Sequence, residues 1–449
     1  MLKFVSCITL LFVMGSWSIA SIPAEEVWPG FRGWGNSVSE AKNLPRTWEL
    51  RGRSRGWTTR LPGYGQSSPV VWKEKVFVTS VSGDQKEHLH ISAIHLGTGE
   101  QLWQKDFAAT QKVRDSDTVT RGAPTPVVDA ERLYVAFESG DIIALSHTGE
   151  ILWQRSFVKD YGEIMGPHGY SSSPILADDL LIAQVCHNGP SYLLACDTRT
   201  GQNRWKIDHP SQTGWSSPVS YRDGHGTGII ASTAGSVRAY DAKTGREWWH
   251  VTGIQGNSTA SPTVVDNLVV IGASERGGGG SRRGSGGGPP NTTKPAAQES
   301  PLAADPQQAG SAVIRLGGSG DVTQTHVVWR SPKITTGYSS PLVYEGLAYF
   351  TNKVGALQCV NLLTGEIKWH HRLPGQMWAS AIASDGHLFF FCKEGEVAVL
   401  KAGPVLEVVG ENSISVTDIV YGVAAVDNAW LVRSGRSLVK VVATTDSQP

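Results

Sequence analysis

The sequence repeats one short phrase, and this repeat decides the fold. The phrase reads DTRTGQNRW at residues 197–205, DAKTGREWW at 241–249 and NLLTGEIKW at 361–369, with looser copies ending at 103 and 153. In every copy a tryptophan follows the threonine of a Thr-Gly pair by five residues. Glycine can adopt the positive φ of a tight turn, and the strand after the turn can present a large ring for packing. We interpret the phrase as a device that docks one repeat on the next. The predicted docking residues are Trp57, Trp103, Trp153, Trp205, Trp249 and Trp369.

A second phrase opens each repeat. It reads SSPVV from residue 67, SSPIL from 172 and SSPLV from 339, and related forms begin at 124, 216, 260, 379 and 423. Successive copies lie about 40 to 57 residues apart, except for one longer interval. Each unit contains about four short apolar runs bounded by Gly, Pro, Asp and Ser, which is typical of strands. Such units must pack against copies of themselves, so the sequence predicts an all-β protein, a single β-propeller of eight four-stranded blades.

The two ends of the chain are predicted to complete one blade together. The last unit, which opens at 423, ends after three strands, whereas GWTTRLPG at 56–63 is a strand that precedes the first unit. We therefore expect this N-terminal strand to close the ring. The predicted propeller covers residues 46–445 and follows an N-terminal segment at 25–45.

Two segments are predicted to lie outside the blades. Residues 1–24 contain an early Lys3, an apolar stretch from Phe4 to Met14 and then small residues, which indicates a secretory signal peptide. The long interval contains a Gly-, Ser-, Pro- and Gln-rich tract at 277–310, which is predicted to be a disordered loop insertion. We expect an exported protein, periplasmic or secreted, without a transmembrane anchor after cleavage.

The overall charge of the sequence bears on the class of partner. The 40 Lys and Arg residues balance the 40 Asp and Glu residues, which argues against nucleic acid as a partner.

Cys186 and Cys196 flank HNGPSYLLA, and a hairpin turning at 189–191 would set them opposite each other. In an oxidising compartment this arrangement is compatible with a disulfide and equally with two buried thiols.

The loops that lead into the innermost strands are expected to ring the propeller axis at one face. The candidate ligand-binding residues of this axial mouth are Arg121, His168, Tyr170, Trp215, Asn257, Tyr338 and Trp378. Such a set could stack a flat ligand or a peptide side chain. The alternative, which we favour, is that the rings fill the channel and pack on adjacent loops. No metal-ligand spacing and no catalytic residue is predicted.

The motif Ala-x-Asp-x-x-Thr-Gly-x-x-x-Trp at 195–205 and 239–249 resembles the quinoprotein-type, or PQQ-like, propeller repeats. The resemblance covers residues 46–445 and implies one of two functions. One branch of the family contains exported dehydrogenases that hold pyrroloquinoline quinone and calcium on the propeller axis. The other contains non-catalytic scaffolds similar to BamB, a lipoprotein that assists the assembly of outer-membrane β-barrels.

The residues favour the second branch. Alcohol-oxidising members of the first branch carry two adjacent cysteines over the cofactor, and this sequence has no such pair. Nor can the Glu, Asn and Asp set that would hold calcium be assigned. We therefore expect a non-catalytic scaffold that binds envelope or extracellular proteins and needs no cofactor. The alternative is a dehydrogenase that oxidises an alcohol or sugar with pyrroloquinoline quinone and calcium.

Overall fold

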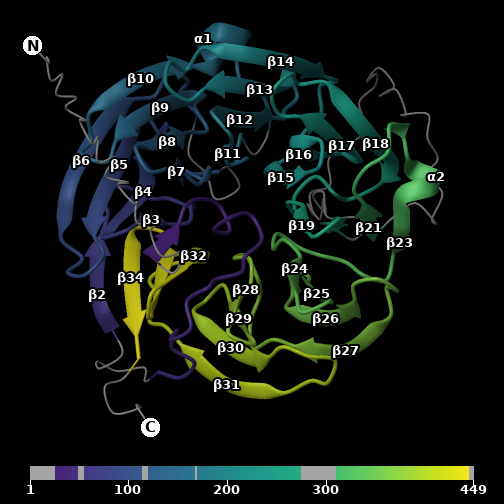
Figure 1. Ribbon diagram of the computed structural model, residues 1–449. Helices are drawn as coiled ribbons and strands as arrows, with labels where there is room; N and C mark the ends of the chain where they lie inside the picture. The colour runs from purple at the N-terminus through teal and green to yellow at the C-terminus, as the bar shows by residue number, and fades with distance from the viewer. Residues whose placement is uncertain (1–25, 49–54, 114–119, 167–168, 275–309, 444–449) are drawn as a thin grey trace, which may run out of the picture.

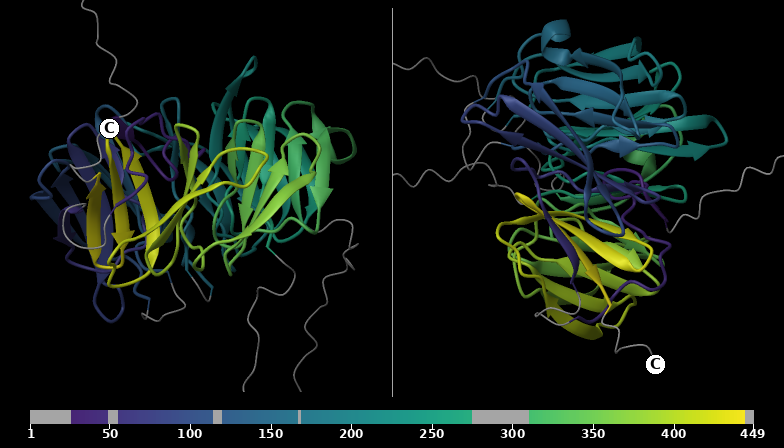
Figure 2. Two further views of the ribbon diagram at one scale, coloured as in Figure 1. Left: turned by 90° about the horizontal axis from the view of Figure 1, so that it is seen from below. Right: turned by 90° about the vertical axis from the view of Figure 1, so that its left-hand side faces the viewer.

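Eight antiparallel sheets surround one axis, as the sequence predicts (Figure 1). The computed structural model describes residues 26–48, 55–113, 120–166, 169–274 and 310–443. Viewed from the side, the ring is a thick disc whose strands run across its thickness (Figure 2). The predicted signal peptide at 1–24 and the predicted insertion, apart from Gly310, lie outside the described residues. None of the helices among the described residues is both long and apolar enough to cross a membrane.

The first four blades follow the chain in order, each running from its innermost to its outermost strand. Blade 1 has β3 (Val70–Trp72), β4 (Lys75–Ser82), β5 (His88–His95) and β6 (Gln101–Ala108), with β1 (Val27–Trp28) at its inner edge. Blade 2 has β7 (Val127–Val128), β8 (Arg132–Ala136), β9 (Asp141–Ser146) and β10 (Ile151–Ser156), and α1 (Phe157–Tyr161) follows it. Blade 3 has β11 (Ile175–Ala177), β12 (Leu180–Val185), β13 (Ser191–Asp197) and β14 (Asn203–His209). Blade 4 has β15 (Val219–Asp223), β16 (Gly226–Thr233), β17 (Gly235–Asp241) and β18 (Glu247–Ile254).

The remaining blades contain the irregular features of the ring. Blade 5 has β19 (Thr263–Val265), β20 (Leu268–Ile271), β21 (Ser311–Arg315) and β23 (Val327–Ser331), with β22 (Gly320–Asp321) and α2 (Thr323–His326) between the last two. Blade 6 has β24 (Leu342–Tyr344), β25 (Leu347–Thr351), β26 (Ala356–Asn361) and β27 (Ile367–Arg372). Blade 7 has β28 (Ile382–Ser384), β29 (His387–Phe391), β30 (Glu396–Lys401) and β31 (Val408–Ser413). Blade 8 has β32 (Val420–Val426), β33 (Ala429–Ser434), β34 (Ser437–Val442) and β2 (Arg55–Arg60).

The predicted closure of the ring is confirmed. Strand β2 pairs with β34 in antiparallel register, with Trp57 opposite Lys440. The outermost strand of blade 8 therefore comes from the N-terminal part of the chain and its other strands from the C-terminal part. Figure 1 shows β2 beside the yellow strand β34 in this blade.

The Thr-Gly turns connect the two outer strands of a blade, and tryptophans of the preceding blade lie on them. The ring of Trp205 in blade 3 covers Gly245 in blade 4, where an added Cβ would lie 2.7 Å from the indole. The indole nitrogen of Trp205 donates to the carbonyl oxygen of Ala242 at 2.8 Å. Because Gly245 has φ +73°, glycine serves both the turn and the close approach of the ring. The same contact joins Trp57 to Gly99, Trp103 to Gly149 and Trp153 to Gly201.

Two tryptophans depart from the predicted pattern, one outside the predicted set and one within it. Trp329 in blade 5 docks on Gly365 and donates to the carbonyl of Leu362, although no Thr-Gly pair precedes it in the sequence. Trp249 is buried between blades 4 and 5, but its indole nitrogen has no hydrogen-bond partner among the described residues. The cause is the β21–β23 connection, since β22 replaces the tight turn and pairs in parallel with β18. Trp369 keeps its hydrogen bond, to the carbonyl of Gly403 at 3.1 Å.

In the first seven repeats the opening phrase forms an incomplete ring of hydrogen bonds to hydroxyl groups, a role that the sequence analysis missed. The backbone nitrogen of Ser173 donates to the hydroxyl of Ser217, and that of Ser217 donates to the hydroxyl of Ser261, both at 2.8 Å. Each hydroxyl thus holds the backbone of the preceding blade. The residues of this hydroxyl ring are Ser68, Thr125, Ser173, Ser217, Ser261, Ser340 and Ser380.

Residues 26–48 cross the face of the disc that carries the Thr-Gly turns, which we call the turn face. The carbonyl of Pro29 accepts from the backbone nitrogen of Val128 in blade 2. The buried guanidinium of Arg32 donates to the hydroxyl of Thr263 at 2.7 Å and to the carbonyl of Pro262 in blade 5. Val38 then bridges to Ala383 in blade 7. Figure 1 shows this purple segment crossing the centre of the ring.

The cysteine prediction is resolved in favour of thiols. Val185 pairs with Tyr192, which sets Cys196 opposite Leu181, while Cys186 follows the end of β12. The hairpin turns closer to Cys186 than the sequence suggested, so the two cysteines are not opposite each other. Both are free and buried.

Candidate functional site at the mouth face

The face opposite the turn face carries the loops that lead into the innermost strands, and we call it the mouth face. Four aromatic side chains form a continuous row on it, from blade 6 through blades 7 and 8 to blade 1. The ring centroids of Tyr338 and Trp378 are 4.5 Å apart, those of Trp378 and Tyr421 5.7 Å, and those of Tyr421 and Tyr64 6.0 Å. We call Tyr338, Trp378, Tyr421 and Tyr64 the aromatic row.

A cation lies over the ring at each end of the aromatic row. The ammonium nitrogen of Lys353 is 4.5 Å from the centroid of Tyr338, and the guanidinium carbon of Arg121 is 4.8 Å from that of Tyr64. These distances permit cation–π attraction. Tyr338 is 40% exposed, and the other three rings of the row and the two cations are half-buried, so the row is accessible to solvent.

The phenol groups of the row are held by hydrogen bonds. The hydroxyl of Tyr64 donates to Asp418 Oδ1 at 2.9 Å and lies 2.6 Å from the hydroxyl of Tyr421, which is left to donate to it. Burial, followed by these hydrogen bonds, raises the pKa of Tyr64, and burial is the main cause of the raised pKa of Tyr421. Both phenols therefore remain neutral and act as hydrogen-bonding groups rather than bases.

A buried arginine adds positive charge next to the Tyr64 end of the row. Arg433 is fully buried, and its Nε and Nη2 donate to the carbonyls of Gly65 and Thr79 at 3.2 and 3.1 Å. Its Nη1 finds no hydrogen-bond partner, and no carboxylate pairs with the guanidinium, within the part of the chain that the structure describes. Burial lowers the pKa of Arg433 to about 9, so the group stays charged at neutral pH. Gly65 is required there, because an added Cβ would lie 2.3 Å from Nη2.

The structure divides the predicted mouth residues into four groups. Arg121, Tyr338 and Trp378 belong to the aromatic row or its flanks. Trp215 lies elsewhere on the mouth face, half-buried, with its indole nitrogen 3.3 Å from the carbonyl of Gly169. His168 lies outside the described residues.

Two predicted residues are turned into the blades and do not reach the mouth surface. Asn257 is fully buried; its amide nitrogen donates to the hydroxyl of Ser232 and the carbonyl of Ser236, and its amide oxygen accepts from the backbone of Gly235. Tyr170 is 1% exposed and belongs to the core between blades 2 and 3. Their spacing from the opening phrase was right for a mouth position, but the phrase does not record which way each side chain points.

Sequence reasoning missed Tyr64, Lys353 and Arg433 as members of this site. Tyr64 stands just before the first opening phrase, so its position was an available signal. Lys353 and Arg433 lie in or near turns between the second and third strands of blades 6 and 8. Nothing in the sequence of those turns marks them, because only the closed ring brings blades 6, 7, 8 and 1 into one row.

A second polar feature of the mouth face is a buried ion pair between blades 1 and 2. The Lys86 ammonium lies 3.6 Å from Glu138 Oε1, and both side chains are 3% exposed. Lys86 also donates to the carbonyl of Thr120, and the backbone of Gly122 donates to Glu138 Oε1. Burial raises the pKa of Glu138. These bonds tie the β6–β7 loop to blades 1 and 2, which is a structural role.

The residues that the structure describes do not fit a quinone-bound calcium. Such an ion needs several oxygen ligands that converge on one point, including carboxylates. No three His, Cys, Asp or Glu side chains within the described ranges are grouped so that they could hold a metal ion. The amide of Asn257, which was predicted to lie near the axis, is committed to hydrogen bonds inside blade 4.

Comparison with known proteins places the chain in a family. The family model described as "Outer membrane protein assembly factor BamB" matches residues 52–206 and 189–282, together just over half of the sequence. The chain belongs to this family. A protein named outer membrane protein assembly factor BamB from Burkholderia pseudomallei is 26% identical over 222 residues, 48% of this chain and 52% of that protein. The chain thus spans about half the length of the curated relatives it matches.

Solved structures share the fold. BamB from Moraxella catarrhalis aligns with a TM-score of 0.59 and 14% identity, covering 88% of this chain and 98% of that one. A europium-containing methanol dehydrogenase aligns with a TM-score of 0.60 and 11% identity, covering 92% and 91%. At these identities the likeness concerns the propeller alone, because an assembly factor and a dehydrogenase both align with it.

Proposed function

We propose that this chain is an exported, non-catalytic propeller scaffold that binds another protein of the cell envelope through its mouth face. One observation carries the proposal, namely the aromatic row with a cation at each end. Tyrosine, tryptophan and arginine are the side chains enriched at protein–protein interfaces and at their energetic centres. The family relatives, which are named as outer membrane protein assembly factors, support a role in the envelope.

The competing function is a quinone-dependent dehydrogenase, and the donor set at the axis argues against it. The polar groups that a cofactor would need are used inside the protein, as at Asn257. The aromatic side chains contact one another from blade to blade instead of lining a slot for a flat ring. The fold likeness to methanol dehydrogenase is shared with BamB and does not favour either function.

A photo-crosslinking experiment tests the proposal. A benzoyl-phenylalanine is placed at Tyr338 on the mouth face or at Leu363, which is 64% exposed on the turn face of the same blade. We expect irradiation of cells that export the chain to give a discrete protein adduct from position 338 and none from 363. Adducts from both positions or from neither would contradict a mouth-face interface.

A cofactor titration tests the alternative. Tryptophan fluorescence of the purified chain is followed as pyrroloquinoline quinone is added, with and without calcium. We expect no saturable change at tens of micromolar. Calcium-dependent, saturable quenching that is lost in Trp378→Ala would support the dehydrogenase instead.

A further inference from the structure

We propose that a cavity beneath the N-terminal segment binds a small carboxylate with an apolar body. The site lies on the turn-face side of the ring and does not depend on the mouth-face interface proposed above. Three features point to this ligand, namely the apolar lining of the cavity, the buried guanidinium in its wall and its volume.

The cavity lies between residues 29–35 and the innermost strands of blades 2, 3 and 4. Its volume is about 100 Å³, and most of its lining is apolar. Trp34 is one of the lining residues and is 63% exposed on the turn face, so the cavity reaches that surface. We call this space the Arg32 cavity, and its lining includes Phe31, Arg32, Trp34, Val127, Ile175 and Val219.

The wall of the Arg32 cavity contains a positive charge that no carboxylate of the described residues balances. Arg32 is 5% exposed, and burial lowers its pKa to about 9, so the guanidinium stays charged at neutral pH. Nη1 and Nη2 donate to Thr263 and Pro262 in blade 5, neither of which lines the cavity. Nε has no hydrogen-bond partner among the residues that the structure describes. The guanidinium carbon lies 5.6 Å from the centroid of Phe31, which does line the cavity.

A carboxylate has the charge and the acceptors that this guanidinium lacks. A cation that is removed from water is costly unless it is paired, and a guanidinium pairs with a carboxylate through two parallel hydrogen bonds. Nε and the N–H groups that are not bonded to blade 5 are donors for such a pair. Because the rest of the lining is apolar, a ligand with an apolar body also removes that surface from water.

The volume of the Arg32 cavity limits the size of the ligand. An apolar cavity of about 150 Å³ holds benzene, so a cavity of about 100 Å³ accommodates an acid of roughly four or five carbon atoms. A shorter acid such as acetate leaves apolar wall uncovered, and a neutral amide of the same shape lacks the charge. Pentanoate should therefore bind more tightly than either acetate or pentanamide.

Titration calorimetry of the full exported chain with pentanoate, acetate and pentanamide tests the inference. We expect saturable binding of pentanoate, about tenfold or more tighter than that of the other two. Arg32→Met removes the charge, and Ile175→Phe narrows the cavity and leaves Arg32 in place, so each should weaken pentanoate binding about tenfold or more. Arg46→Met is the matched control, because Arg46 belongs to the same segment but pairs with Asp385 outside the cavity. Melting curves establish that the variants are folded.

Three results would overturn the inference. Pentanoate could give no saturable heat in the millimolar range, or acetate or pentanamide could bind as tightly as pentanoate. The third is that pentanoate binds equally to the unchanged chain and to folded Ile175→Phe. If Arg32→Met does not fold, the comparison of Ile175→Phe with Arg46→Met decides. None of these results alters the crosslinking expected from position 338, so the scaffold function is tested separately.

Discussion

Two blade interfaces show how the same ring is held by different means. Between blades 3 and 4, Trp205 lies on Gly245 as the repeated phrase prescribes. Between blades 7 and 8 the phrase is missing, and Gly410 pairs with Val399 where other blades have the docking tryptophan. Blade 8 has no Thr-Gly turn to receive a ring, because its two outer strands come from opposite ends of the chain.

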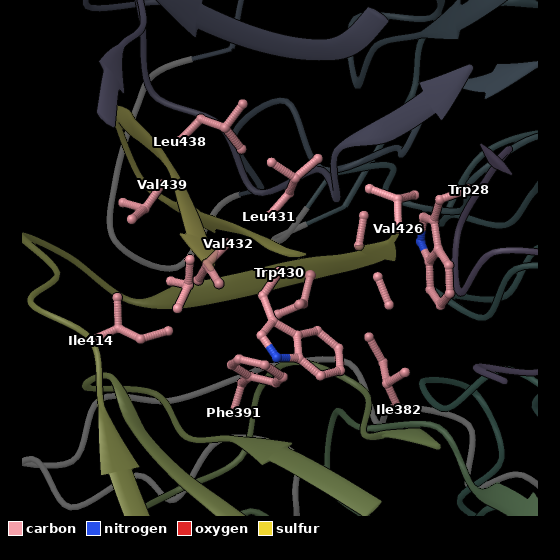
Figure 3. Packing of buried hydrophobic residues seen from close by; sticks show 14 of the residues in the cluster. Trp28, Ile382, Phe391, Ile414, Val426, Trp430, Leu431, Val432, Leu438 and Val439 are labelled. Atoms are coloured by element: carbon pink, nitrogen blue, oxygen red, sulfur yellow. The ribbon is translucent and has the colours of Figure 1, made fainter. Parts of the chain in front are cut away.

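The N-terminal segment supplies the packing that replaces the missing tryptophan–glycine contact between blades 7 and 8. Residues 44–48 pack there around the fully buried Trp430, whose indole nitrogen donates to the carbonyl of Pro45 at 2.9 Å. Trp430 also contacts Phe389 and Phe391, with ring centroids 4.5 and 5.1 Å away, and Figure 3 shows Trp430 beside Phe391. A repeated interface is thus specified by a local phrase, whereas the closing interface needs residues distant in sequence.

The largest effect is expected at the closing interface. Trp430→Ala removes a fully buried indole whose neighbours come from blade 7 and the N-terminal segment, so it should cost about 4 kcal/mol of unfolding free energy. Urea unfolding followed by fluorescence measures it. Trp34→Ala serves as the control, since that ring is 63% exposed. Equal losses in both variants would show that the closing interface contributes no special stability.

The regular interface should respond to a single added carbon atom. Gly245→Ala adds a Cβ 2.7 Å from the Trp205 ring at φ +73°, and we expect a loss of about 3 kcal/mol from overpacking and backbone strain together. Gly346→Ala is a matched control at φ +75° with nothing within 4 Å of the added atom, so strain alone should cost about 1 kcal/mol. The urea midpoints of the two variants are compared. Equal shifts would mean that the Trp205 indole moves aside without a cost in stability.

Each hydrogen bond of the hydroxyl ring should contribute to the unfolding free energy. Ser217→Ala deprives the buried backbone nitrogen of Ser173 of its acceptor and should cost about 1 to 2 kcal/mol. Ser216→Ala is the control, because its buried hydroxyl has no partner among the described residues. The same urea series measures both variants. A loss in Ser216→Ala as large as that in Ser217→Ala would argue against the ring.

The smallest effect is expected on the pH dependence of stability, through the ionisation of Asp197. The hydrogen bond from Arg204, followed by bonds within the Thr-Gly turn, lowers the pKa of Asp197 from 3.8 to about 2. A carboxylate whose pKa is lower in the folded state stabilises the fold above its unfolded pKa and loses that contribution as pH falls through its folded pKa. Asp197→Asn should therefore lower the urea midpoint slightly at about pH 6, and the gap should close between about pH 4 and pH 2. A gap independent of pH would exclude this ionisation as its cause.

The blade count and the closing strand were predictable because both depend on local patterns. A Thr-Gly turn and a tryptophan five residues later specify a turn and a packed ring within one unit, and eight copies of the opening phrase count the blades. The Thr-Gly phrase did not identify Trp329 as a docking residue, because β22 and α2 replace the tight turn before it. It also gave no account of Gly422. The pairing of Val426 with Ala429 places this glycine where blade 1 has Ser68, and a Cβ there would lie 2.2 Å from the Ser68 hydroxyl.

By itself, the sequence determined what each repeat does, since propensity, turn chemistry and cross-strand pairing act over a few residues. Only the tertiary structure decided which side chains of different repeats meet at the mouth face. Tyr338 and Tyr64 are far apart in sequence and belong to one row because the ring brings blades 6 and 1 to the same face. Asn257 and Trp378 hold comparable places near their opening phrases, yet one is buried in its blade and the other contacts its neighbours at the surface. Side-chain direction is set by packing between neighbouring blades, and closure of the ring is set by the pairing of β2 with β34, which brings together residues far apart in sequence.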